Sequence, residues 1–184
     1  GKYIVKVVKS INKHFNLVHI GVEVLVMSKR IMNEVMCLAE EQDIEIYYQD
    51  TDSIHIKEND IDKLAGVFEK TYKRKLIGKD MGQFHTDFSI GGCKDVYAEK
   101  SIFLGKKKYV DALVGIDVKT GEVKRDLHIR MAGIPTSCVE YEAKNKYEGD
   151  IFKLYEELYK GKEIKFDLLE GGCKVNFQHT KDMR

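Results

Sequence analysis

The sequence predicts an α+β fold, in which an antiparallel sheet with flanking helices is followed by a small αβ unit. Several segments carry apolar residues at helical spacing, and shorter segments between them alternate apolar with polar residues. Turn residues such as Gly separate these shorter segments, which is typical of antiparallel strands. The 184 residues, 43% of them hydrophobic and 33% charged, are enough to bury a good core.

The N-terminal third is expected to hold two extended segments and one long helix. Residues 3–8 and 17–20 are rich in Val and Ile and are predicted to be extended. A helix is predicted from about Val22, and the acidic run Glu40-Glu41-Gln42-Asp43 is expected to end it, because negative charge is unfavourable at a helix C-terminus. Its apolar stripe is Val24, Met27, Ile31, Val35 and Leu38, widened by Met32 and Met36. So broad a stripe predicts a helix that is covered on most sides.

A β-hairpin and a second helix are predicted next. Residues 44–48 and 53–57 alternate in polarity, and Asp50-Thr51-Asp52 between them would form the tip of a tight hairpin. The second helix is expected after Asn59, a favourable N-cap residue, and before Gly78.

The remaining elements are three strands, one or two helices and a final hairpin. Strands are predicted over residues 96–103, 108–117 and 123–131, and helices over 136–144 and 150–159. The last two strands would cover residues 164–169 and 173–178, around Gly171-Gly172. The break at Gly133-Ile134-Pro135 predicts a domain boundary between residues 1–133 and 134–184.

Composition narrows the classes of protein to which the chain can belong. Its 31 basic and 30 acidic residues give a net charge of +1, which argues neither for nor against nucleic acid. The four cysteines lie far apart, without a CxxC pair, and fit reduced thiols in a cytoplasm-like compartment. The longest apolar runs, residues 24–27 and 35–39, are too short to span a bilayer, so no membrane partner is expected. No signal or transit peptide is apparent. Since the sequence begins with Gly rather than Met, we expect it to be a piece of a longer protein.

The two carboxylates of the predicted hairpin form a candidate metal site. Side chains two apart on an extended chain point to the same face, so Asp50 and Asp52 are expected to project together. Two neighbouring carboxylates stay ionised most readily around a cation, and Mg²⁺, with Mn²⁺ as the alternative, prefers such oxygen ligands. A solvated Asp turn and the Asp-x-Asp site of a nucleotide-sugar transferase are the competing interpretations. An EF-hand loop is excluded, because Ile54 and His55 stand where a ligand and a Gly are required.

A basic and aromatic cluster follows at Lys106, Lys107, Lys108 and Tyr109. On a strand, Lys107 and Tyr109 would share one face, and Lys106 and Lys108 the other. Lysines bind phosphates as point charges, and a tyrosine offers a hydroxyl and a ring to a sugar. The alternative is a solvated basic edge strand. Asp111 lies two residues further on the same face as Tyr109 and has no assigned role. The histidines show no metal-ligand spacing and are expected at the surface or in the core.

These residues carry a resemblance to family B DNA polymerases. The hexapeptide Tyr48-Gln49-Asp50-Thr51-Asp52-Ser53 resembles the Tyr-x-Asp-Thr-Asp-Ser motif of their palm, and Lys107-Lys108-Tyr109 resembles their Lys-x-Tyr motif. Residues 131–134 and the Gly171-Gly172 hairpin are similar to the end of the palm and the short thumb. The likeness is greatest to the viral, phage and linear-plasmid branch, whose members are often protein-primed. It implies that residues 1–133 are the later part of a palm and that residues 134–184 are a thumb.

The resemblance also implies a role for each residue of the two motifs. Asp52 would bind the two catalytic Mg²⁺ ions directly, and Asp50 would assist electrostatically or through water. Tyr48, Thr51 and Ser53 would support the turn. Lys107 and Tyr109 would hold the primer strand near its growing end, with Lys106 and Lys108 beside them.

The expected activity is the addition of deoxynucleotides to a primer 3′ end, in the cytoplasm of an infected host cell. Primer-template DNA, deoxynucleoside triphosphates and a terminal protein primer are the partners implied. A further metal-binding Asp and a nucleotide-binding fingers helix are not found ahead of Gly21. The upstream part of the same polymerase is therefore an expected partner, and the chain by itself is expected to be inactive or nearly so. A non-catalytic DNA-binding fragment is the remaining alternative.

Overall fold

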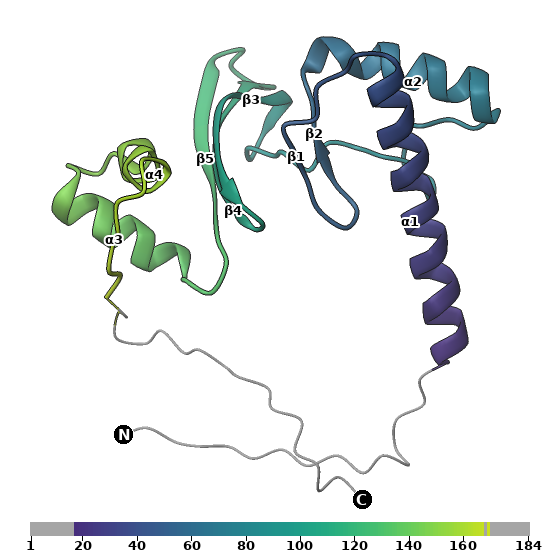
Figure 1. Cartoon of the computed structure of the whole chain (residues 1–184). Helices are drawn as coiled ribbons and strands as arrows, with labels where there is room; N and C mark the ends of the chain where they lie inside the picture. The colour runs from purple at the N-terminus through teal and green to yellow at the C-terminus, as the bar shows by residue number, and fades with distance from the viewer. Residues whose placement is uncertain (1–16, 168, 170–184) are drawn as a thin grey trace, which may run out of the picture.

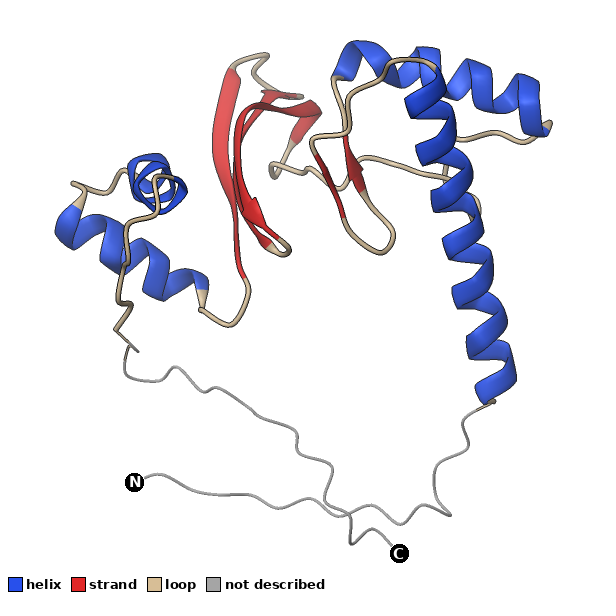
Figure 2. Cartoon of the chain, viewed as in Figure 1, coloured by secondary structure: helices blue, strands red, loops and turns tan. Residues whose placement is uncertain are grey.

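The computed structural model describes residues 17–167 and 169 and has a mixed α+β architecture, as predicted. Four helices, one two-stranded antiparallel sheet and one three-stranded antiparallel sheet make up this part of the chain (Figures 1 and 2). The predicted strands at residues 3–8 and 173–178, and the Gly171-Gly172 turn, lie outside the described residues.

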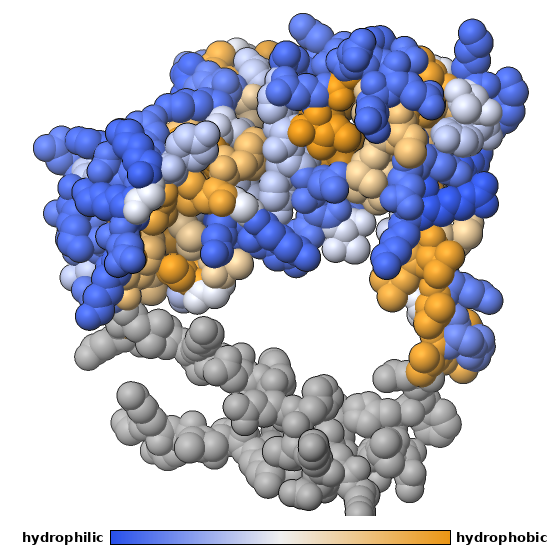
Figure 3. All heavy atoms as spheres, in the orientation of Figure 1, coloured by the Kyte–Doolittle hydropathy of each residue, from blue (hydrophilic) through white to orange (hydrophobic). Residues whose placement is uncertain are grey.

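The long helix α1 (Val18–Glu41) begins earlier than predicted, so the extended segment predicted over residues 17–20 is wrong. The β-branched residues there lower helix propensity only slightly, and adding a turn to an existing helix is favourable. The expectation that this helix is covered on most sides is also wrong. Its buried residues all come from its second half, whereas Val24 and Leu25 are 62% and 56% exposed. Figure 3 shows these first turns as an apolar surface.

The second half of α1 packs against α2 (Glu58–Tyr72), and the hairpin strands β1 (Tyr48–Gln49) and β2 (Ile54–His55) lie between them in the chain. Asn59 is not the N-cap. Lys57 occupies that position without a side-chain hydrogen bond, and Glu58 and Asp60 place negative charge in the first turn of α2, where the helix dipole favours it. The buried residues shared by this half of the structure are Val35, Leu38, Ala39, Ile44, Leu64, Phe68 and Leu76.

The three-stranded sheet consists of β3 (Cys93–Gly105), β4 (Lys108–Asp117) and β5 (Val123–Met131), in that spatial order. The predicted bounds of β4 and β5 are confirmed, and β3 begins at Cys93 rather than Val96. The register between β4 and β5 is continuous, whereas the pairing of β3 with β4 contains register shifts. Such bulges bend a strand and increase its twist.

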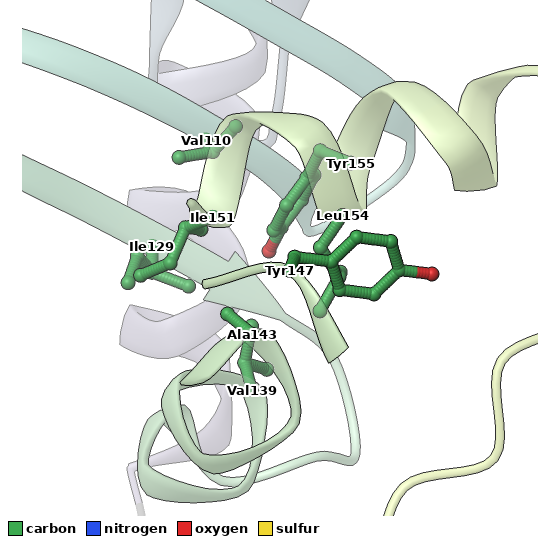
Figure 4. Packing of buried hydrophobic residues seen from close by; sticks show 8 residues of the cluster. All are labelled: Val110, Ile129, Val139, Ala143, Tyr147, Ile151, Leu154 and Tyr155. Carbon is green, nitrogen blue, oxygen red and sulfur yellow. The ribbon is translucent and has the colours of Figure 1, made fainter. Parts of the chain in front are cut away.

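Helices α3 (Thr136–Lys146) and α4 (Ile151–Tyr159) pack on this sheet. Figure 4 shows their shared core, which contains Val110, Ile129, Val139, Ala143, Tyr147, Ile151, Leu154 and Tyr155. The carboxylate of Asp150 caps α4 by accepting a hydrogen bond from the backbone N–H of Lys153 at 3.0 Å. Residues 164–167 form no strand, so that part of the predicted final hairpin is wrong. The boundary expected near residue 133 stays a prediction, although sheet and helices share one core.

Within residues 17–167 and 169, no helix combines the length and apolar character that a membrane crossing requires.

Candidate functional site

The predicted carboxylate hairpin is present. Tyr48 pairs with His55 and Gln49 with Ile54, and the N–H of Asp50 donates to the carbonyl of Ser53 at 2.9 Å. The strands are shorter than predicted because only these pairs form a ladder. Asp50, Thr51, Asp52 and Ser53 therefore occupy the tip of the hairpin.

The structure corrects the placement of the lysine cluster. Strand β3 ends at Gly105 and β4 begins at Lys108, so Lys106 and Lys107 form the two-residue turn between paired neighbours. Lys107, the second residue of the turn, has φ 58°, in the left-handed region. The prediction that Lys107 and Tyr109 share a strand face is wrong, because Lys107 lies in the turn and Tyr109 on the strand.

The two motifs, far apart in sequence, meet at these turns. The backbone N–H of Lys107 donates a hydrogen bond of 2.9 Å to the hydroxyl of Tyr48. Its ammonium lies 3.9 Å from Oδ2 of Asp50. The structure thus brings Tyr48, Asp50 and Lys107 together.

Asp50 is held by donors from its own turn. Its Oδ1 accepts hydrogen bonds from the N–H of Thr51 at 2.9 Å and from the Thr51 hydroxyl at 3.3 Å, and its Oδ2 lies 3.5 Å from the Tyr48 hydroxyl. Partial desolvation raises the pKa of Asp50, but the Thr51 hydrogen bonds and the positive charge of Lys107 outweigh it and lower the pKa overall. Asp50 is therefore a carboxylate at neutral pH whose oxygens already accept hydrogen bonds.

Asp52 differs from Asp50, because it is exposed and forms no hydrogen bond or ion pair with another described residue. Lys106 and Lys108 are exposed as well. Over residues 17–167 and 169, no group of three or more His, Cys, Asp or Glu side chains is placed to hold a metal ion. The carboxylate of Asp52 suits Mg²⁺ as a hard oxygen ligand, whereas Oδ1 of Asp50 already accepts two hydrogen bonds from Thr51. The described residues therefore fit part of a metal site, which needs at least one more carboxylate.

An aromatic cluster of six rings lies behind the two hairpin tips. Its members are Tyr48, His55, Phe88, Phe103, Tyr109 and His128, and each strand of the two sheets supplies one ring. Tyr48 stacks on Phe103 at 5.4 Å with an interplanar angle of 4°, and its ring centroid lies 4.9 Å from that of Tyr109. Stacked and edge-to-face rings attract one another in addition to burying area. The cluster therefore joins the two sheets at the point where the motifs meet.

A buried carboxylate lies beside this cluster. Asp111 is completely buried, and the strand register places Ser101 and His128 directly opposite it on β3 and β5. Its Oδ1 accepts a hydrogen bond from the Ser101 hydroxyl at 2.7 Å, and its Oδ2 from Nδ1 of His128 at 2.9 Å. Nε2 of His55 is 3.9 Å from the same Oδ2.

Reasoning from the sequence missed most of these residues. The sequence assigns no role to Asp111 and predicts His55 and His128 only at the surface or in the core. The one usable signal was that Asp111 follows Tyr109 by two positions on a strand and so shares its face. Burial and the negative charge of Asp111 raise the pKa of Tyr109, so its hydroxyl keeps its proton at neutral pH.

Comparisons with protein-family models, with curated protein sequences and with solved structures found no match. What the chain does is therefore inferred from the arrangement of its own residues.

Proposed function

We propose that this chain is the C-terminal palm and thumb portion of a family B DNA-directed DNA polymerase, which extends a primer 3′ end. The contact between the hairpin of residues 48–53 and the turn at Lys106-Lys107 supports this proposal most. A nucleotidyltransferase needs metal-binding carboxylates and cations for the primer phosphates within one site, and this contact brings the turn that carries Asp52 next to the turn that carries Lys107.

The two carboxylates of the hairpin would have different tasks. Asp52, exposed and unengaged within the described chain, would hold Mg²⁺ together with an Asp from the upstream part of the protein. The bound ions would supply charge neutralisation for the attacking hydroxyl and the leaving pyrophosphate. Asp50, which accepts hydrogen bonds from Thr51, would keep the turn in shape and keep Lys107 in place.

The lysine turn would bind the primer strand through its phosphates. Lys106, Lys107 and Lys108 are exposed, so their ammonium groups are accessible to a phosphodiester backbone. The Tyr109 hydroxyl keeps its proton and can donate a hydrogen bond to a sugar or phosphate oxygen. Such binding weakens as the salt concentration rises, because counterions are released when phosphates are neutralised.

Primer extension by the full-length polymerase tests the assignment. Asp52→Ala should abolish nucleotide incorporation while leaving primer-template affinity largely intact, since the change removes a metal ligand and not a phosphate contact. Asp62→Ala, which changes an exposed carboxylate on α2, is the matched control and should incorporate normally. Near-normal incorporation by Asp52→Ala would contradict the proposal.

Two further substitutions test the primer contacts. Lys107→Ala and Tyr109→Phe should weaken use of the primer terminus, and Lys107→Ala should also reduce the dependence of DNA binding on salt. Lys119→Ala, in an exposed turn away from the hairpin tips, serves as the control. Unchanged primer affinity in both variants would mean that residues 106–109 form only a solvated basic surface.

The alternatives give different results with the 184-residue chain. An Asp-x-Asp nucleotide-sugar transferase would bind a nucleotide sugar and would not shift a primer-template duplex in a gel. A DNA-binding fragment would shift the duplex and extend no primer, and it would remain inactive when joined to the upstream part of the protein. A palm and thumb portion should extend a primer only after it is joined to the upstream part of the protein.

A further inference from the structure

The contact between β2 and β4 contains a histidine without hydrogen-bond partners. Neither ring nitrogen of His55 has one among the described residues, although both atoms are buried. Burying a polar group without a partner costs free energy. Oδ2 of Asp111 lies 3.9 Å from Nε2 of His55, too far for a hydrogen bond.

Asp111 has room for one more donor. Its two oxygens accept one hydrogen bond each, from the hydroxyl of Ser101 and from Nδ1 of His128. An ionised carboxylate offers about four lone-pair positions, and this one has no contact with water, since its exposure is 0%. A buried carboxylate with only these two hydrogen bonds is therefore stabilised by a further donor that carries a positive charge.

We propose that His55 and Asp111 form a proton-operated joint, in which protonation of His55 draws the β1–β2 hairpin toward β4. This inference rests on the packing of the two sheets and is independent of the polymerase proposal. The neutral ring can already carry its single proton on Nε2, and protonation adds a positive charge that faces the Asp111 carboxylate. Closing the gap to an ordinary hydrogen-bond length of about 2.9 Å moves the ring by roughly 1 Å.

The movement would reach the candidate site through the strand pairing. Tyr48 is the ladder partner of His55, and its hydroxyl contacts the backbone of Lys107. A displacement of β2 therefore changes the position of Tyr48 against Lys107, and with it the turn that holds Asp50 and Asp52.

Every titratable group around His55 bears on the pH at which the joint closes. The ring of His55 contacts those of Tyr48 on β1 and Tyr109 on β4, together with Phe88 and Phe103, and Asp111 on β4 lies 3.9 Å away. His128 on β5 is near enough for its charge to act on His55. Burial lowers the pKa of His55, Asp111 opposes this by raising it, and His128 lowers it further. The net direction is downward, so closure occurs below the ordinary histidine pKa of about 6.5.

An NMR titration of the isotopically labelled 184-residue chain tests the joint. The imidazole resonances of His55 and the backbone amide resonances of Thr51 and Lys107 are followed from pH 8 to pH 4.5. All are expected to shift with one common midpoint below pH 6.5. Amide shifts at Thr51 and Lys107 that do not follow the His55 midpoint would overturn the proposal.

Two substitutions should shift the midpoint of the His55 titration in opposite directions. Asp111→Asn removes the attracting anion and should move the His55 midpoint to lower pH. His128→Gln removes a competing imidazole and should move it to higher pH. His85→Gln, which changes an exposed histidine in the loop after α2, is the control and should leave it unchanged. If Asp111→Asn fails to fold, His128→Gln decides the matter, because amide midpoints of Thr51 and Lys107 that do not move with the His55 midpoint in that variant contradict the joint.

Discussion

The hydroxyl of Tyr48 accepts a hydrogen bond of 2.9 Å from the backbone N–H of Lys107, a residue 59 positions away in the sequence. The two residues belong to different hairpins and different sheets. The bond sets the spacing between the turn that carries Asp50 and the turn that carries Lys107, whose side chains form a long ion pair. This phenol therefore contributes directly to the arrangement of the candidate site.

Replacing this phenol by phenylalanine should loosen the contact without removing the ring. Tyr48→Phe keeps the stacking on Phe103 but leaves the Lys107 amide without its acceptor, so the free energy of unfolding should fall by about 0.5–1.5 kcal/mol. Urea denaturation measures this loss, and faster hydrogen exchange of the Lys107 amide locates it. Tyr159→Phe, at a side chain 73% exposed, should change neither quantity.

Helix α1 should respond very differently to the same substitution in its two halves. Leu38 is 4% exposed and lies in the core shared with α2, whereas Leu25 is 56% exposed. Leu38→Ala should therefore cost about 2–5 kcal/mol of unfolding free energy, and Leu25→Ala no more than about 0.5 kcal/mol. Equal losses, measured by chemical denaturation, would mean that the first turns of α1 are buried in solution.

Asp117 should contribute to stability in a pH-dependent manner. The Lys124 ammonium and the backbone N–H groups of Thr120 and Lys119 lower the pKa of this carboxyl to about 2, below its ordinary value of about 3.9. A depressed pKa in the folded state gives stability that is present above pH 4 and is lost as the pH falls toward 2. The difference in unfolding free energy between the wild type and Asp117→Asn should thus shrink over this range.

The control for that experiment is Asp62→Asn, on the exposed face of α2, whose difference from the wild type should stay small at every pH. A difference for Asp117→Asn that is the same at pH 6 and pH 2.5 would show that the carboxyl charge has no part in holding the β4–β5 turn.

Tyr155 ties α4 to the edge of the sheet. Its side chain is fully buried, and its hydroxyl donates to the carbonyl of Arg130 at 2.8 Å. Tyr155→Phe should lower the unfolding free energy by about 1–3 kcal/mol, because the carbonyl loses its donor in a buried place. Tyr141→Phe, with the hydroxyl of a side chain 43% exposed, is the matched control on α3. Similar melting curves for the two variants would contradict this role.

The elements that could be predicted from the sequence are those specified by local signals. The hairpin at residues 48–55 and strand β5 follow from alternation and turn residues within a few positions, and both are present. The helical periodicity of α1 also identified the helix, but not its exposure. Periodicity tells which residues are apolar, and whether another element covers them depends on the rest of the fold.

The candidate site was only half predictable for a similar reason. Asp50, Asp52 and the lysine cluster stand out as short motifs, whereas the Ser101–Asp111–His128 row exists only through the pairing of three strands. His55 joins that row from a different sheet. Partners that are set by register across the fold leave no signal in the spacing of one segment.

The left-handed backbone of Lys107 places two opposed demands on one position. A residue with a Cβ pays about 1 kcal/mol for φ 58°, and Gly would relieve that cost. The same exchange would remove the ammonium that lies next to Asp50. Gly at position 107 would thus favour the stability of the fold, whereas Lys107 supplies a positive charge where the two hairpins meet.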